Sequence, residues 1–161
     1  KIAMISRFKT KKLRKELMKR AEKTGVILID ADEPNVAFRA LKAIKSGRIL
    51  ITECDEFSEW RPHHSEQISV FGHRVSRDKT LDFFYRRAKV PAFMGLIRRE
   101  KRGFTLSIDP LADGYKDVSL AAKAWERLES YILKYPQQWY QWKGAATQLA
   151  EYIMQDQKYR K

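Results

Sequence analysis

Residues 7–52 alternate between helical and strand-like patterns, and this alternation limits the possible folds more than any other feature of the sequence. The apolar side chains Leu13, Leu17 and Ala21 recur at helical spacing, and Gly25 follows where glycine commonly ends a helix. Eight of the fourteen residues in positions 7–20 are Lys or Arg. The first predicted helix is therefore strongly basic.

Two short apolar runs flank a second predicted helix. Val26–Ile29 and Arg48–Thr52 have the length and the β-branched residues of buried strands. Between these runs, Asp32–Pro34 is typical of a helix start with proline in the first turn, and Gly47 ends the apolar stripe. Helices that alternate with strands at this spacing predict βαβ units and a parallel sheet.

The second half of the chain continues with further strands and ends in helices. We expect strands at Gln67–Phe71 and Pro91–Ile97, with a helix over Leu81–Ala88 between them. A hairpin turn should then lead back through Phe104–Ile108, and the remainder should be helical with a break at Pro136. The predicted fold is α/β, with a mostly parallel sheet, flanking helices and a C-terminal helical segment.

The composition indicates one folded domain with a strongly basic charge. We expect residues 1–161 to form a single α/β domain, because this length can bury a core of its own. The net charge of +13 is compatible with nucleic acid or an anionic membrane surface as a partner, and equally with a basic solvated surface that has no dedicated partner. A single cysteine, Cys54, excludes a disulfide framework, and no apolar run approaches the ~20 residues that span a bilayer.

His73 and Asp78 have the H-x-x-x-x-D spacing with which many lipid acyltransferases deprotonate an acceptor hydroxyl. The predicted strand, turn and helix around the pair would present His73 as an exposed general base. Alternatively, Asp78 caps the following helix and His73 is an ordinary polar residue in a turn. The two residues by themselves leave both interpretations open.

Other site chemistries have less support. Cys54, His63, His64 and His73 lack the spacings typical of zinc ligands. The sequence has no phosphate-binding glycine loop and no nucleophile elbow. The acidic loop Glu53–Glu56 follows a predicted strand at the edge where α/β proteins bind ligands, so its carboxylates could pair with a phosphate-binding arginine or could simply be solvated.

Five segments follow one another in the order of the motifs of one enzyme family. They are Gly47–Asp55, Ser69–Gly72 with the predicted helix Leu81–Ala88 after it, Lys89–Phe93, Leu128–Ile132 and Pro136–Trp139. Together they resemble the late acyltransferases of bacterial lipid A biosynthesis, within the wider lysophospholipid acyltransferases. The chain departs from that family after Lys143, where Gly-Ala-Ala replaces a basic cluster.

The resemblance implies a transferase of lipid metabolism. Such an enzyme moves a fatty acyl chain from a thioester of acyl carrier protein or coenzyme A to a hydroxyl of a lipid A precursor or lysophospholipid. It needs no metal and no cofactor beyond that donor. The implied location is the cytoplasmic face of the bacterial inner membrane, where the protein would be peripheral or anchored by a segment outside this chain.

The resemblance also assigns residues. In the family, the histidine–carboxylate dyad precedes the motif that corresponds to Gly47–Asp55. The general base is therefore expected upstream of Lys1, the chain is expected to be the C-terminal portion of a longer enzyme that is inactive by itself, and His73 is not expected to be the base. Arg20, Asp55 and Arg98 are the implied substrate-binding residues.

Two interpretations from other classes remain. The charge alone also fits a basic nucleic-acid-binding protein, although no zinc module or helix-turn-helix pattern accompanies it. The altered tail after Lys143 fits a non-catalytic lipid-binding relative.

Overall fold

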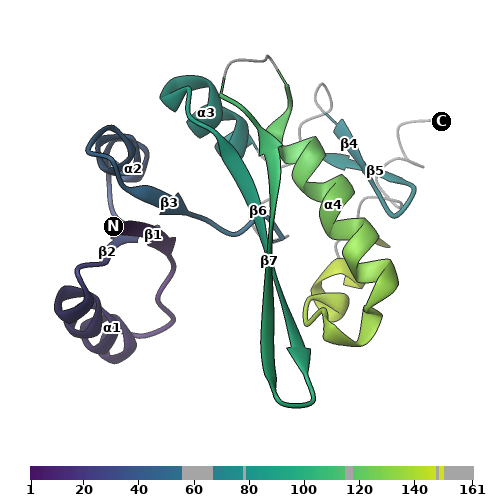
Figure 1. Cartoon of the computed structure of the whole chain (residues 1–161), viewed down its shortest axis with the longest axis horizontal. Coiled ribbons are helices and arrows are strands. Elements are labelled where there is room, and N and C mark those ends of the chain that lie inside the picture. The colour runs from purple at the N-terminus through teal and green to yellow at the C-terminus, as the bar shows by residue number, and fades with distance from the viewer. Residues whose placement is uncertain (56–66, 78, 115–117, 148, 151–161) are drawn as a thin grey trace. The chain divides into compact units, whose positions relative to one another are not determined.

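The computed structural model describes residues 1–55, 67–77, 79–114, 118–147 and 149–150. The chain divides into two compact units, Lys1–Glu53 and Cys54–Lys161, which we call unit 1 and unit 2 (Figure 1). The described residues combine helices with small sheets, so the predicted α/β class is confirmed.

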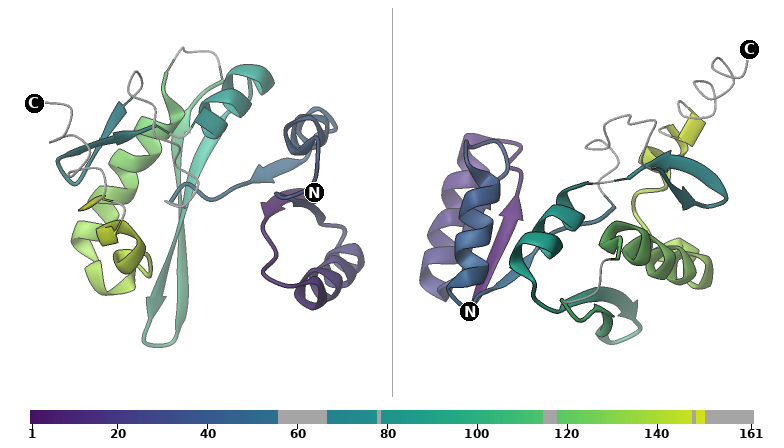
Figure 2. Two further views of the ribbon diagram at one scale, coloured as in Figure 1. Left: turned by 180° about the vertical axis from the view of Figure 1, so that it is seen from behind. Right: turned by 90° about the horizontal axis from the view of Figure 1, so that it is seen from above.

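Unit 1 is a small parallel α/β structure. Its elements are β1 (Ile2–Ser6), α1 (Lys11–Thr24), β2 (Ile27–Asp30), α2 (Val36–Lys45) and β3 (Ile49–Ile51). The strands pair in parallel in the order β2-β1-β3, and each helix connects two of them (Figure 2). The predicted βαβ units are therefore present.

Local signals explain the ends of α1 and α2. The hydroxyl of Thr10 accepts a hydrogen bond from the Leu13 amide at 3.1 Å, and Gly25 ends α1 with a φ of 69°. The second helix begins at Val36, later than the predicted start at Asp32–Pro34.

The central strand of the sheet, β1, is missing from the sequence prediction. Ala3 lies opposite Ile27 on one side and Leu50 on the other, and its side chain is fully buried. The short apolar run Ile2–Ile5 carried the signal.

The described part of unit 2 contains two antiparallel hairpins, two α-helices, a 3₁₀ turn and a further helical segment near its end. Its elements are β4 (Gln67–Val70), β5 (His73–Ser76), α3 (Lys79–Ala88), β6 (Ala92–Glu100), β7 (Gly103–Ala112), α4 (Leu120–Lys134) and the 3₁₀ turn η2 (Pro136–Gln138). Strand β4 pairs with β5, and β6 with β7, both antiparallel. Among the described strands, the expected mostly parallel sheet is thus limited to the three strands of unit 1.

The first hairpin contains a strand, β5, that the sequence analysis did not predict. Phe71 and Gly72 form its turn with φ angles of 49° and 77°, and positive values at both central residues are characteristic of a tight hairpin. The break predicted at Pro136 is confirmed by η2. Residues 142–147 and 149–150 are helical, and the rest of the predicted last helix lies outside the described residues.

The core of unit 2 forms along α4. This helix buries six residues: Leu120, Ala121, Ala124, Trp125, Leu128 and Ile132. They pack with apolar residues from α3, β4, β5 and β6. Within the described residues, no helix has both the length and the apolar composition needed to cross a bilayer.

A buried carboxylate fixes the start of α4. Asp82, on α3, is only 3% exposed. It accepts hydrogen bonds from the amides of Leu120 at 2.6 Å and Ala121 at 3.2 Å, and it lies 3.1 Å from Nε of Arg77. These contacts join α3 to the end of α4 where backbone amides lack helical partners.

Candidate functional site

The segment that follows α4 connects two distant parts of unit 2. The indole Nε1 of Trp139 donates a hydrogen bond to Asp55 at 2.9 Å. The side-chain amide of Gln138 accepts from the Arg99 amide at 2.7 Å and donates to the Arg99 carbonyl at 3.1 Å. Residues 135–139 therefore contact both Asp55 and the end of β6. We call Asp55, Arg98, Tyr135, Gln138 and Trp139 the unit 2 site.

Arg98 is bound at the other end of this segment. Its guanidinium donates to Glu100 and to the hydroxyl of Tyr135, and it lies 4.7 Å from the centre of the Tyr135 ring. The hydrogen bond from Arg98 holds the pKa of Glu100 below its usual value. Glu100 thus partly neutralises the positive charge of Arg98, and an anionic ligand would have to compete with this carboxylate for the guanidinium.

Aromatic packing fixes the orientation of Trp139. This residue is 7% exposed, and its ring centre lies 4.9 Å from that of Trp142 and 5.8 Å from that of Phe71. Trp142 in turn donates to the Pro136 carbonyl at 2.6 Å. Because neighbouring rings hold the indole, its N–H is preorganised toward Asp55.

The structure brings together two of the three substrate-binding residues expected from the sequence. Asp55 and Arg98 both contact residues 135–139, whereas Arg20 is an exposed residue of α1 in unit 1. Asp55 is partly buried and is thus less solvated than an ordinary loop carboxylate. Neither Gln138 nor Tyr135 was singled out from the sequence as a contact, because only their pairing with β6 reveals their role.

Among the described residues, the histidines form no group that resembles a catalytic or metal site. His73 is exposed on β5, where it pairs with Val70, and its proposed partner Asp78 lies outside the described residues, as do His63 and His64. Among the residues that the structure describes, no three His, Cys, Asp or Glu side chains form a group that could hold a metal ion.

If the full-length protein catalyses the acyl transfer that the sequence resemblance implies, we predict that His73→Ala leaves its rate close to that of the wild type. An exposed hairpin histidine has no described feature that would activate it, whereas loss of a true general base typically costs ~10²–10⁴-fold. Initial rates of the two proteins under identical conditions give the comparison. A hundredfold loss, with an unchanged melting temperature, would make His73 the base.

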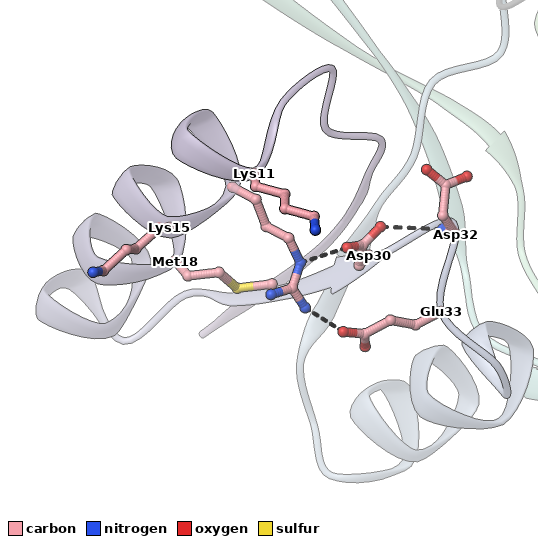
Figure 3. Close-up of a pocket in the computed structure, with 7 residues that line it drawn as sticks. Lys11, Lys15, Met18, Asp30, Asp32 and Glu33 are labelled. Atoms are coloured by element: carbon pink, nitrogen blue, oxygen red, sulfur yellow. Dashed lines mark hydrogen bonds and ion pairs between the residues drawn. The ribbon is translucent and has the colours of Figure 1, made fainter.

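A second polar cluster lies in unit 1, at the carboxyl end of β2. It borders a depression of about 640 Å³ lined by Lys11, Arg14, Lys15, Met18, Asp30, Asp32 and Glu33 (Figure 3). Asp30 is 6% exposed and accepts hydrogen bonds from Nε of Arg14 at 2.6 Å and from the Asp32 amide at 3.1 Å. Arg14 also donates to Glu33, which accepts a further hydrogen bond from Arg39.

This cluster links α1 to the end of β2, and it contains charges of both signs. Three cationic side chains face three carboxylates around the depression, and the ion pairs of Arg14 connect α1 to the end of β2. This cluster was not expected from the sequence, although the carboxylates Asp30, Asp32 and Glu33 closely follow a predicted strand. Its described contacts indicate a structural role.

The Asp30 carboxylate should make the stability of unit 1 depend on pH. The hydrogen bond from Arg14 is the main cause that lowers the pKa of Asp30 below 3.8. A lowered folded-state pKa gives stability that is present above the unfolded-state value and is lost as the pH falls through the folded-state value. We expect the melting temperature to fall on acidification below about pH 4, and to fall less in Asp30→Asn. Equal slopes for the two proteins would contradict this assignment.

Comparison with known proteins adds no family to these observations. No protein-family model matches the chain, and no curated protein matches it significantly. The unit 2 site is therefore defined by its own contacts.

Proposed function

We propose that this chain is the C-terminal portion of an acyltransferase that resembles the late acyltransferases of bacterial lipid A biosynthesis. The enzyme would transfer a fatty acyl chain from a carrier thioester to a hydroxyl of a lipid A precursor or lysophospholipid. It would work at the cytoplasmic face of the inner membrane. The observation that carries the proposal is the hydrogen bond from Trp139 to Asp55, between residues 84 positions apart.

This hydrogen bond joins two of the segments on which the resemblance rests. Asp55 ends the segment that begins at Gly47, and Trp139 ends the segment that begins at Pro136. Gln138, from the second segment, also binds the backbone of Arg99, next to the arginine that the resemblance selects. Motif residues that meet in space are expected if they form one site, and this agreement supports the proposal.

The parallel βαβ arrangement of unit 1 also supports the proposal, but only at the level of the fold. A parallel sheet with crossover helices is the framework expected of the proposed fold, and ligands of such sheets bind at the carboxyl ends of the strands. The finer proposal is that the complete enzyme has a mostly parallel sheet of the acyltransferase type.

The proposed reaction assigns a role to each group. A histidine upstream of Lys1, oriented by its acidic partner, removes the proton of the acceptor hydroxyl. The resulting oxygen attacks the thioester carbonyl carbon, the new ester forms, and the carrier leaves as a thiol after it takes up the proton. The resemblance assigns phosphate contact and site organisation to Arg20, Asp55 and Arg98. In unit 2, the guanidinium of Arg98 would bind a phosphate group of the acceptor through charge-assisted hydrogen bonds, and Asp55 would help to organise the site.

The test is acyl transfer by the protein that includes its upstream segment. Acyl carrier protein thioesters and acyl-coenzyme A are offered in turn, with a lysophospholipid or a lipid A precursor as the acceptor, and the acylated product is measured by mass spectrometry. We expect turnover that disappears when the upstream histidine is replaced by alanine, and none from residues 1–161 alone. Vesicle binding without turnover would identify a non-catalytic relative, and salt-sensitive binding to duplex DNA without either would support the nucleic-acid alternative.

A further inference from the structure

The β6–β7 hairpin has one face of large apolar side chains that unit 2 leaves exposed. Five of them are between 58% and 73% exposed: Phe93, Ile97, Phe104, Leu106 and Ile108. The strand register places them together, because Ile97 lies opposite Leu106, and Phe93 and Ile108 follow on the same face at intervals of two. We call these five residues the hairpin apolar face.

The opposite face of the hairpin is the one that packs on unit 2. Met94 is 8% exposed within the core, and Leu96 packs against that core. The hydroxyl of Tyr131, on α4, donates to the Ile97 carbonyl at 3.0 Å, and α4 lies along the hairpin in Figure 1. Since side chains alternate between the two faces of a strand, the hairpin apolar face is turned away from α4.

The turn of the hairpin adds positive charge to one end of this face. Arg99, Lys101 and Arg102 are all exposed, and Arg99 lies opposite Phe104 in the register. The single carboxylate there, Glu100, is already bound by Arg98. The hairpin thus combines an apolar surface with a cationic tip.

We propose that this hairpin is the surface by which the protein docks on an anionic phospholipid bilayer. The apolar side chains would lie among the upper acyl chains, and the three cations of the tip would contact lipid phosphates. The inference deepens the proposed function, on which the choice of a membrane as partner rests. The basic residues 7–20 on α1 offer positive charge as well, but the hairpin combines charge with an exposed apolar face.

Charge complementarity favours a bilayer over a second copy of the chain. Two copies that met through this face would each carry a net charge of +13, so their approach would be opposed by repulsion. An anionic surface is attracted by the same charge, and each Lys or Arg near it strengthens binding. Large aliphatic and aromatic side chains beside cations are typical of segments that lie in the interface of a membrane.

The test measures binding of the full chain to vesicles of phosphatidylcholine with and without phosphatidylglycerol, in the absence of an acyl donor. The first variant, Ile97→Ser with Leu106→Ser, removes a cross-strand pair from the hairpin apolar face. We expect its binding to fall about a hundredfold, because each lost side chain contributes about tenfold when buried. The matched control, Phe38→Ser with Leu133→Ser, removes two equally exposed side chains elsewhere and should bind like the wild type.

A second pair of variants tests the tip. Lys101→Glu with Arg102→Glu should weaken binding by at least about tenfold and reduce its dependence on salt. Lys11→Glu with Lys15→Glu makes the same change of charge on α1 and should have a smaller effect.

Three results would overturn the docking surface. One is wild-type vesicle binding by Ile97→Ser with Leu106→Ser. Another is a melting temperature several degrees below the wild type in that variant, because the face would then be covered within the folded protein. The third is a dimer in sedimentation equilibrium that the same variant converts to a monomer. Acyl transfer to a detergent-dispersed acceptor by the protein that includes its upstream segment separates the two proposals. Activity without hairpin-dependent vesicle binding contradicts only the docking surface, and hairpin-dependent binding without activity of that longer protein contradicts only the enzyme.

Discussion

Replacing Asp82 with alanine is expected to lower the free energy of unfolding by about 3–5 kcal/mol, the usual cost of removing one partner from a buried charged pair. The carboxylate is 3% exposed, so water does not easily replace it. Its loss removes the acceptor for the amides of Leu120 and Ala121 and takes away the negative charge beside Arg77. Chemical denaturation of the wild type and the variant measures the difference.

Two control variants separate the contributions of Asp82. Asp82→Asn keeps an acceptor for the α4 amides but loses the charge, so it should be less harmful than alanine. Ser119→Ala removes the hydroxyl that caps α4 at the Ala122 amide, and it should cost about 1 kcal/mol. If Asp82→Ala destabilised the protein no more than Ser119→Ala does, the buried carboxylate would not be what joins α3 to α4.

Replacing Asp55 with asparagine in the full-length protein is expected to slow the proposed acyl transfer by about 10²–10³-fold, the range typical of one preorganised polar group in an active site. The indole of Trp139 holds this carboxylate, and the variant retains its size and its acceptor oxygen. The loss would therefore reflect the missing charge. Values of kcat and KM for each variant, together with melting temperatures, give the measurement.

Trp139→Phe is the matched variant for Asp55. Phenylalanine keeps an aromatic ring against Phe71 and Trp142 but removes the N–H that points to Asp55. We expect a smaller loss of rate than in Asp55→Asn, since the carboxylate remains but is no longer oriented. Wild-type activity of Asp55→Asn would exclude Asp55 from the site.

The sequence predicted the helices of this chain better than its strand pairing. Thr10 and Gly25 mark the ends of α1 through contacts within a few residues, and such local signals can be read without a structure. The strand β1 has no comparable local mark, and its central position depends on pairing with residues more than twenty positions away. The antiparallel pairing in unit 2 likewise depends on turns such as Phe71–Gly72. The two residue types allow the positive φ angles of this turn but do not by themselves predict them.

The candidate site shows the same limit. Asp55 and Arg98 came from a resemblance of motifs, and so did the segment Pro136–Trp139, but the contacts between these segments came only from the structure. Gln138 and Tyr135 are ordinary polar residues in the sequence, and their importance depends on contacts with β6 across 37 and 39 positions. The carboxylate Asp30 was overlooked for a similar reason, since its arginine partner lies on the preceding helix.

The paired hydrogen bonds of Gln138 also protect the protein against self-association. A strand edge with free amide and carbonyl groups is a template on which another chain can add a strand. At Arg99, one side-chain amide occupies both backbone groups, as a neighbouring strand would. Gln138 therefore blocks edge-to-edge polymerisation at this point of β6, so a hairpin with an apolar face can be displayed with less risk of fibril growth from that edge.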